Sequence, residues 1–72
     1  MNMNKLSLLE KTGLTLRNKR RKLKLSQFAL SNNCQISRNQ ISEIERGKIN
    51  ITINTLLKLC TALHIPVRRI FY

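Results

Sequence analysis

The chain has 72 residues, which is enough for one small domain spanning residues 1–72. Its 14 Lys and Arg residues face only 3 acidic residues, and the net charge of +11 predicts attraction to polyanions, nucleic acid first and anionic membrane surfaces second. The apolar stretches are too short to form a transmembrane helix, and no signal-peptide pattern opens the chain. We therefore expect a cytoplasmic protein that does not enter membranes.

Few side chains suit catalysis or metal binding. The three acids, His64 and two cysteines form no acid–base pair and no activated nucleophile. Cys34 and Cys60 also lack the Cys/His spacing of a zinc site, so two buried, reduced thiols are expected. The composition predicts a protein that is not an enzyme and has no metal, cofactor or small-molecule ligand.

The first predicted helix spans residues 7–24 and follows a loose tail at residues 1–6. Apolar or small residues recur at i, i+4, i+7, i+11 and i+14, as on one face of a helix. One member of this face is charged. The face consists of Leu9, Gly13, Leu16, Arg20 and Leu23.

Capping residues predict three more helices. Ser26 caps a helix over residues 27–33, and Ser37 caps one over residues 38–45 that ends at Arg46-Gly47. Thr52 caps a fourth helix whose predicted inward face comprises Ile53, Leu56, Leu57, Cys60 and Leu63.

Pro66 stands where the first residue of a helix tolerates proline, so a fifth helical turn is expected to open there. His64 is interpreted as a residue at the surface or at the end of the fourth helix. The pattern contains five short helices and no strand, which predicts an all-α fold.

A short helix, a turn of about four residues and a second short helix with a polar outer face form the helix-turn-helix of DNA-binding proteins. This pattern lies at about residues 26–46, and the run from 13 to 71 resembles the phage-repressor/Cro-type (XRE-like) family without gaps. The matching residues are Ser26-Gln27, Leu30, Ile36-Ser37, "IS.IERGK" from Ile41 to Lys48, and "N.T..TLLKLC.AL.I" from Asn50 to Ile65.

The ending of the chain is particularly similar to small stand-alone regulators of this family, such as restriction-modification controller proteins. The resemblance implies a compact five-helix, lambda-repressor-like domain that binds operator DNA as a two-fold dimer. Three positions depart from the family pattern: Gln35 and Lys24 stand where glycine is usual, and Phe28 stands where an acid is usual. The role of Phe28 is open between packing on the N-terminal segment and contact with another protein.

The helix over residues 38–45 has a polar face opposite Ile41 and Ile44. Arg can donate two hydrogen bonds to guanine, Asn can pair with adenine, and Glu can accept from cytosine, so this face is predicted to read bases. For Glu43 we prefer exclusion of wrong bases over a clamp on Arg38, because residues five apart face each other poorly. The predicted base-reading residues are Ser37, Arg38, Asn39, Ser42 and Glu43.

Contacts with the DNA backbone are expected beside this face. The resemblance assigns Gln27 to a phosphate, and Arg46, Lys48 and Asn50 follow the reading helix, where they can contact the same strand. The basic run over residues 17–24 has two open interpretations, a solvated helix face or a general polyanion-binding patch.

Arg20 and Glu45 are both predicted at buried or nearly buried positions, where an isolated charge is costly. An ion pair between them would remove the cost of an isolated buried charge at both positions. The family resemblance points to the same pair. Glu45 is therefore expected to be structural, while Glu43 faces the DNA.

The C-terminal residues are predicted to form the dimer interface, because the helix-turn-helix is committed to DNA. The predicted interface consists of Leu59, Ala62, Ile70, Phe71 and Tyr72, with Leu59 and Ala62 off the main buried face of their helix. Alternatively, Ile70 and Phe71 only cap the core of the monomer. Two symmetric copies predict an operator that is an inverted repeat.

The favoured function is a dimeric transcriptional regulator of a palindromic operator, with RNA polymerase as a further partner. A second hypothesis is an antitoxin or adaptor with a protein partner and autoregulatory DNA binding. A third is a nonspecific binder of RNA or DNA that depends on charge alone.

Overall fold

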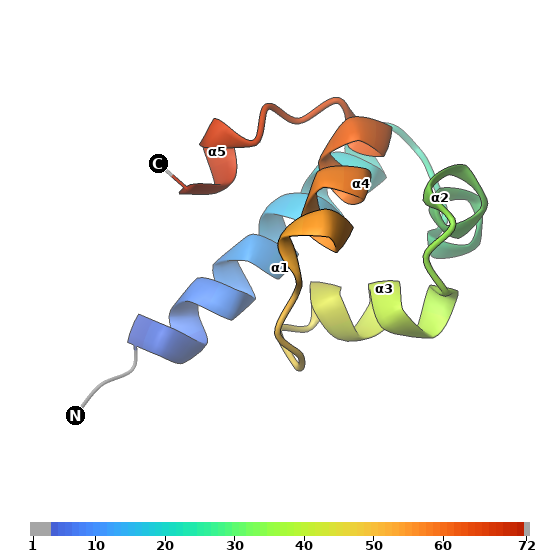
Figure 1. Ribbon diagram of the computed structural model, residues 1–72. Coiled ribbons are helices and arrows are strands. Elements are labelled where there is room, and N and C mark those ends of the chain that lie inside the picture. The colour runs from blue at the N-terminus through green and yellow to red at the C-terminus, as the bar shows by residue number, and fades with distance from the viewer. Residues whose placement is uncertain (1–3, 72) are drawn as a thin grey trace.

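The computed structural model describes the backbone of residues 4–71 and the side chains of residues 8–70. It contains five helices: α1 (Asn4–Lys22), α2 (Gln27–Cys34), α3 (Arg38–Glu45), α4 (Ile53–Leu63) and α5 (Arg68–Phe71). In Figure 1, α4 lies along the second half of α1, α2 and α3 lie to one side, and α5 lies on the other. No strand occurs within residues 4–71, and the predicted all-α, five-helix fold is confirmed.

Side-chain caps fix the beginnings of three helices. The hydroxyl oxygen of Ser26 accepts from the Ala29 amide at 3.0 Å, that of Ser37 from the Gln40 amide at 3.1 Å, and that of Thr52 from the Thr55 amide at 3.2 Å. Each cap satisfies one of the amide groups that the first turn leaves unpaired. The two helices of the helix-turn-helix, α2 and α3, therefore begin directly after Ser26 and Ser37, as predicted.

Left-handed residues close the helices. Lys24 has φ 60°, Gln35 and His64 each have φ 59°, and Gly47 has φ 68°. Lys24 and Gln35 thus adopt the conformation that the missing glycines would supply, at a cost of about 1 kcal/mol each. The departures from the family pattern change the residue type but not the backbone geometry.

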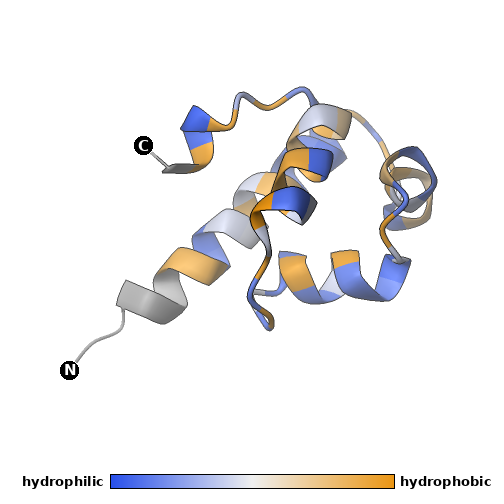
Figure 2. Ribbon diagram, viewed as in Figure 1, coloured by the Kyte–Doolittle hydropathy of each residue, from blue (hydrophilic) through white to orange (hydrophobic). Residues whose placement is uncertain are grey.

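The hydrophobic core lies where α1, α2, α3 and α4 meet. Its most completely buried side chains are Leu16, Leu30, Ile41, Leu59, Leu63 and Cys60. Figure 2 shows hydrophilic residues at the beginning of α3 and hydrophobic bands further along the helix, which packs on α1 and α2. None of the helices described is both long enough and apolar enough to cross a membrane.

Gly13 allows α1 to pack directly on the end of α3. A Cβ atom added at Gly13 would collide with the carbonyl oxygen of Ile44 and lie 2.6 Å from that of Glu45. Both obstacles are backbone atoms, which cannot move away as a flexible side chain would. This close approach brings the neighbouring residues of α1 against Glu45.

Several predicted helix ends are wrong by a few residues. α1 begins at Asn4, so residues 4–6 of the expected tail are helical, and it ends at Lys22 because left-handed Lys24 closes it. Residues 1–3 lie outside the described part. α2 continues one residue further than expected, to Cys34, and α5 begins at Arg68 instead of Pro66, whose carbonyl oxygen accepts from the Arg69 amide at 2.9 Å.

The predicted inward face of α4 is also partly wrong. Leu59 is 1% exposed and belongs to the core, whereas Ile53 and Leu57 are 60% and 41% exposed. The apolar arc of α4 is wider than the surface that α1 and α2 cover, so docking decides which part of it is buried. Leu23 of the first predicted face is likewise 38% exposed, because it follows the end of α1.

Candidate nucleic-acid interface

The outer face of α3 carries the predicted base-reading residues. Ile41 and Ile44 are 1% and 3% exposed and turn this helix towards the core. The residues on its other side are left accessible to solvent. Arg38, Asn39 and Glu43 are exposed, and Ser42 is half-buried.

Ser37 has a structural role at the start of this face, because its hydroxyl oxygen accepts the hydrogen bond that caps α3. Its O–H can still donate to another partner. Asn39, Ser42 and Glu43 line a hollow of about 210 Å³ together with Arg46. Three of the five predicted base-reading residues therefore meet at one hollow, which neither Ser37 nor Arg38 lines. No ion pair joins Glu43 to Arg38 among the described side chains.

Arg20 and Glu45 form a buried ion pair between α1 and α3. The Arg20 Nε atom donates to Glu45 Oε2 at 2.7 Å, and Nη2 donates to Oε1 at 3.0 Å. Arg20 Nη1 also donates to the carbonyl oxygen of Leu25 at 2.8 Å. This two-pronged contact is the strong geometry of an arginine–carboxylate pair, and it ties α3 to α1.

Gln27 joins the same network from α2. Its Nε2 atom donates to Glu45 Oε1 at 3.1 Å, so Glu45 connects three helices. The side chain predicted to contact a phosphate is thus already engaged with Glu45. One of its two N–H groups is occupied and the other remains available to a ligand.

The other predicted backbone-contact residues lie on the accessible surface after α3. Arg46, Lys48 and Asn50 are exposed. Arg46 Nε donates to the Ser42 carbonyl oxygen at 3.3 Å, which holds the guanidinium beside the reading face. The loop is held to α3 by the Lys48 amide, which donates to the Glu43 carbonyl oxygen at 2.9 Å.

A second hollow beside α3 was not predicted from the sequence. We call it the arginine hollow; its volume is about 350 Å³ and it is lined by Arg17, Arg20, Arg21, Gln27, Ser42, Glu45 and Arg46. Arg17 and Arg21 belong to the basic run left open above. The i, i+3, i+4 spacing of Arg17, Arg20 and Arg21 was the available signal, since it puts all three on one helix face.

The residues predicted for the dimer interface do not form one exposed patch. Leu59 is wrong for this role, because the monomer already buries it. Ala62 and Ile70 are half-buried against the core, while the side chains of Phe71 and Tyr72 lie outside the described part.

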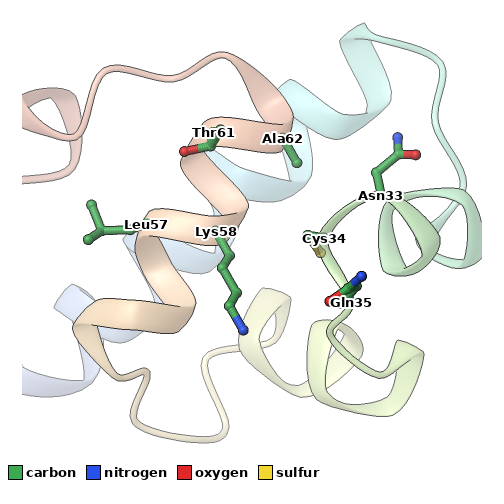
Figure 3. Close-up of a pocket in the computed structure, with 7 residues that line it drawn as sticks. All are labelled: Asn33, Cys34, Gln35, Leu57, Lys58, Thr61 and Ala62. Atoms are coloured by element: carbon green, nitrogen blue, oxygen red, sulfur yellow. The ribbon is translucent and has the colours of Figure 1, made fainter.

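Other apolar surface is available on α4. A hollow of about 430 Å³ lies between α4 and the end of α2. Figure 3 shows the residues that line it: Asn33, Cys34, Gln35, Leu57, Lys58, Thr61 and Ala62. Leu57 and Ile53 are exposed one helical turn apart. The sequence had assigned both of them to the core.

The structure also places the two cysteines, His64 and Phe28. Cys34 and Cys60 are free and buried, and burial raises the pKa of the Cys60 thiol above its ordinary value of 9.0. His64 is the left-handed residue that ends α4. Phe28 is 64% exposed on α2 and does not pack into the core.

A family model described as "Helix-turn-helix" matches residues 16–70. The structure is similar to that of the restriction-modification controller protein C.AhdI from Aeromonas hydrophila, with 38% sequence identity, a TM-score of 0.82, and coverage of 88% of this chain and 96% of that one.

It is also similar to the clp gene regulator ClgR from Corynebacterium glutamicum, with 28% identity, a TM-score of 0.83, and coverage of 89% and 68% of the two chains. The controller protein C.Esp1396I, whose structure is a tetramer in complex with its natural 35 base-pair operator, matches with 28% identity, a TM-score of 0.80, and coverage of 89% and 84%. No curated protein sequence matches the chain. The chain therefore belongs to the XRE-type helix-turn-helix family of DNA-binding transcriptional regulators.

Proposed function

We propose that the protein regulates transcription by placing α3 in the major groove of an operator, as a homodimer on an inverted repeat. The observation that carries this proposal is the outer face of α3, where Arg38, Asn39 and Glu43 are exposed beside the arginine hollow. A face that joins base-specific donors and acceptors to a basic border is suited to reading DNA in the major groove. The family supports this role, and we propose no catalytic activity.

We propose α4 as the centre of the dimer interface. Leu57 and Ile53 are exposed on it, and the adjoining hollow is lined by uncharged residues except for Lys58. Two copies with a net charge of +11 repel each other least where their surfaces carry few charges. The tetrameric structure of C.Esp1396I on operator DNA shows that a similar protein assembles.

The proposed place of action is the cytoplasm, with RNA polymerase as a further partner at the promoter. Exposed Phe28 supports contact with RNA polymerase, because a large aromatic side chain on the first turn of α2 offers an anchor for a protein beside the DNA.

Selection of bound duplexes from a random pool tests the proposed function. We expect the recovered sequences to share an inverted repeat whose half-site centres lie about 34 to 36 Å apart, one turn of DNA. A protein that recovers no shared sequence would contradict the proposal and favour nonspecific binding. A shared sequence without two-fold symmetry would contradict the dimer alone.

Sedimentation over a concentration series tests the interface. Leu57→Asp should remain monomeric at concentrations where the parent forms dimers, because it buries a charge in the contact. Leu8→Asp is the matched control, since Leu8 is an exposed leucine of α1, 61% exposed, and does not belong to α4. Equal dimerisation of Leu57→Asp and the parent would rule out this interface.

A further inference from the structure

The arginine hollow contains more positive charge than the fold requires. Four of the residues that line it are arginines, and Arg20 is neutralised by Glu45 at 2.7 Å. The other two carboxylates of the chain, Glu10 and Glu43, are not among the lining residues. Arg17 and Arg21 therefore face the hollow with no carboxylate among its lining residues except Glu45, which Arg20 already engages. Arg46 also lines the hollow, and it shares two neighbouring hollows with Glu43 and with Glu10.

This arrangement is unfavourable without an anion. Arg17 and Arg21 are four residues apart on α1, where like charges repel and destabilise a helix. A phosphate placed between them removes the repulsion, and guanidinium groups match phosphate oxygens with paired N–H donors. Arg46 adds a third donor from the end of α3, since only its Nε is occupied, by the Ser42 carbonyl oxygen.

Gln27 gives the hollow a neutral donor whose direction is fixed. An ionised carboxylate only accepts hydrogen bonds, so Glu45 holds the nitrogen end of the Gln27 amide at 3.1 Å. Glu45 itself is fixed by two bonds from Arg20. The second N–H of Gln27 remains available at the hollow, which Gln27 also lines.

We propose that the arginine hollow holds a single DNA backbone phosphate, and that Arg17 and Arg21 make α1 part of the DNA interface. The hollow shares Ser42 and Arg46 with the smaller hollow on the reading face, so one strand can reach both. The inference rests on the proposed function for its occupant. Beyond that function, Arg17 and Arg21 of α1 become phosphate ligands, and both bind the same phosphate.

The test uses the full chain and the duplex recovered by selection, with binding measured by fluorescence anisotropy over a salt series. Arg17→Gln with Arg21→Gln should weaken binding roughly tenfold. It should also reduce the slope of log K against log salt by about 0.9 for each protomer, the value for one phosphate. Lys22→Gln with Arg69→Gln is the matched control, because it removes two charges that line a different hollow, formed by α1 and the C-terminal part of the chain. A slope change equal to that of the control, or no change, would overturn the proposal.

A second measurement asks whether the α1 arginines share one phosphate. Single uncharged methylphosphonate linkages placed along the duplex should include one position per half-site that weakens binding of the parent much more than binding of the double variant. Gln27→Met should be less sensitive than the parent to the same linkage, because it removes one of several donors, while the control pair keeps the full sensitivity. If every linkage weakens the double variant as much as the parent, the hollow holds no phosphate. The parent's preference for the recovered duplex over a scrambled one tests the proposed function separately.

Discussion

Replacing Glu45 with alanine tests the link that holds α3 in place. The carboxylate accepts three hydrogen bonds, two from Arg20 and one from Gln27, and its side chain is 4% exposed. Glu45→Ala leaves Arg20, 10% exposed, with only the Leu25 carbonyl oxygen as a partner. A buried guanidinium without its counter-ion is the source of the expected loss.

We expect Glu45→Ala to lose about 3 to 5 kcal/mol of unfolding free energy, the usual cost of removing one partner from a buried ion pair. This is a large part of the total for a small domain, for which about 5 to 15 kcal/mol is typical. Arg20→Met combined with Glu45→Leu should be less destabilising than Glu45→Ala, because it removes both charges and fills the space with apolar atoms.

Urea melts followed by far-UV circular dichroism measure these values, with Glu43→Ala as the control. Glu43 is exposed on the same helix, so its replacement should change stability by less than about 0.5 kcal/mol. A Glu45→Ala protein within that margin of the parent would refute the structural role of the pair. Loss of the folded state in Glu45→Ala alone would support it.

Three further predictions concern readout, packing and the buried thiol. Arg38→Ala should lose about 1 to 3 kcal/mol of binding free energy on the best DNA site and relax the preference at one base pair, whereas Lys48→Ala should weaken binding to all sequences alike. Equal losses of Arg38→Ala on operator and random DNA would contradict the assignment of Arg38 to base reading. Gly13→Ala should destabilise by about 1 to 3 kcal/mol in urea melts, because the added Cβ meets the Ile44 backbone; a protein as stable as the parent would show that the helices do not pack so closely. Because burial raises the pKa of the Cys60 thiol above 9.0, the contribution of the neutral thiol to stability should be lost as pH rises above that value. The free energy of unfolding should therefore fall less between about pH 8 and 10 in Cys60→Ala than in the parent. An equal fall in the two proteins would contradict the burial of the thiol.

Local signals were enough to predict the helix-turn-helix. α3 spans Arg38–Glu45 as expected, because Ser37 caps it and Gly47 follows its end with a positive φ. The ion pair between Arg20 and Glu45 also followed from helix faces, since an unpaired charge at either position would be costly. These features depend on neighbours in sequence or on one strong physical constraint.

Features decided by docking were harder to predict. Leu57 and Leu59 are both apolar residues of α4, and only the positions of α1 and α2 make Leu59 buried and Leu57 exposed. The Gln27 bond to Glu45 likewise depends on how α2 meets α3. Arg17 and Arg21 share a helix face with Arg20, but α2 and α3 are needed to make that face a hollow.

The ratio of two dissociation constants tests the central claim most directly. The protein is titrated at one salt concentration against the duplex recovered by selection and against a scrambled duplex of equal length. Sequence-specific regulation predicts that the recovered duplex binds at least about 10³-fold more tightly. Equal affinity for the two duplexes would show that the charge of +11 alone drives binding, and would contradict base reading by α3.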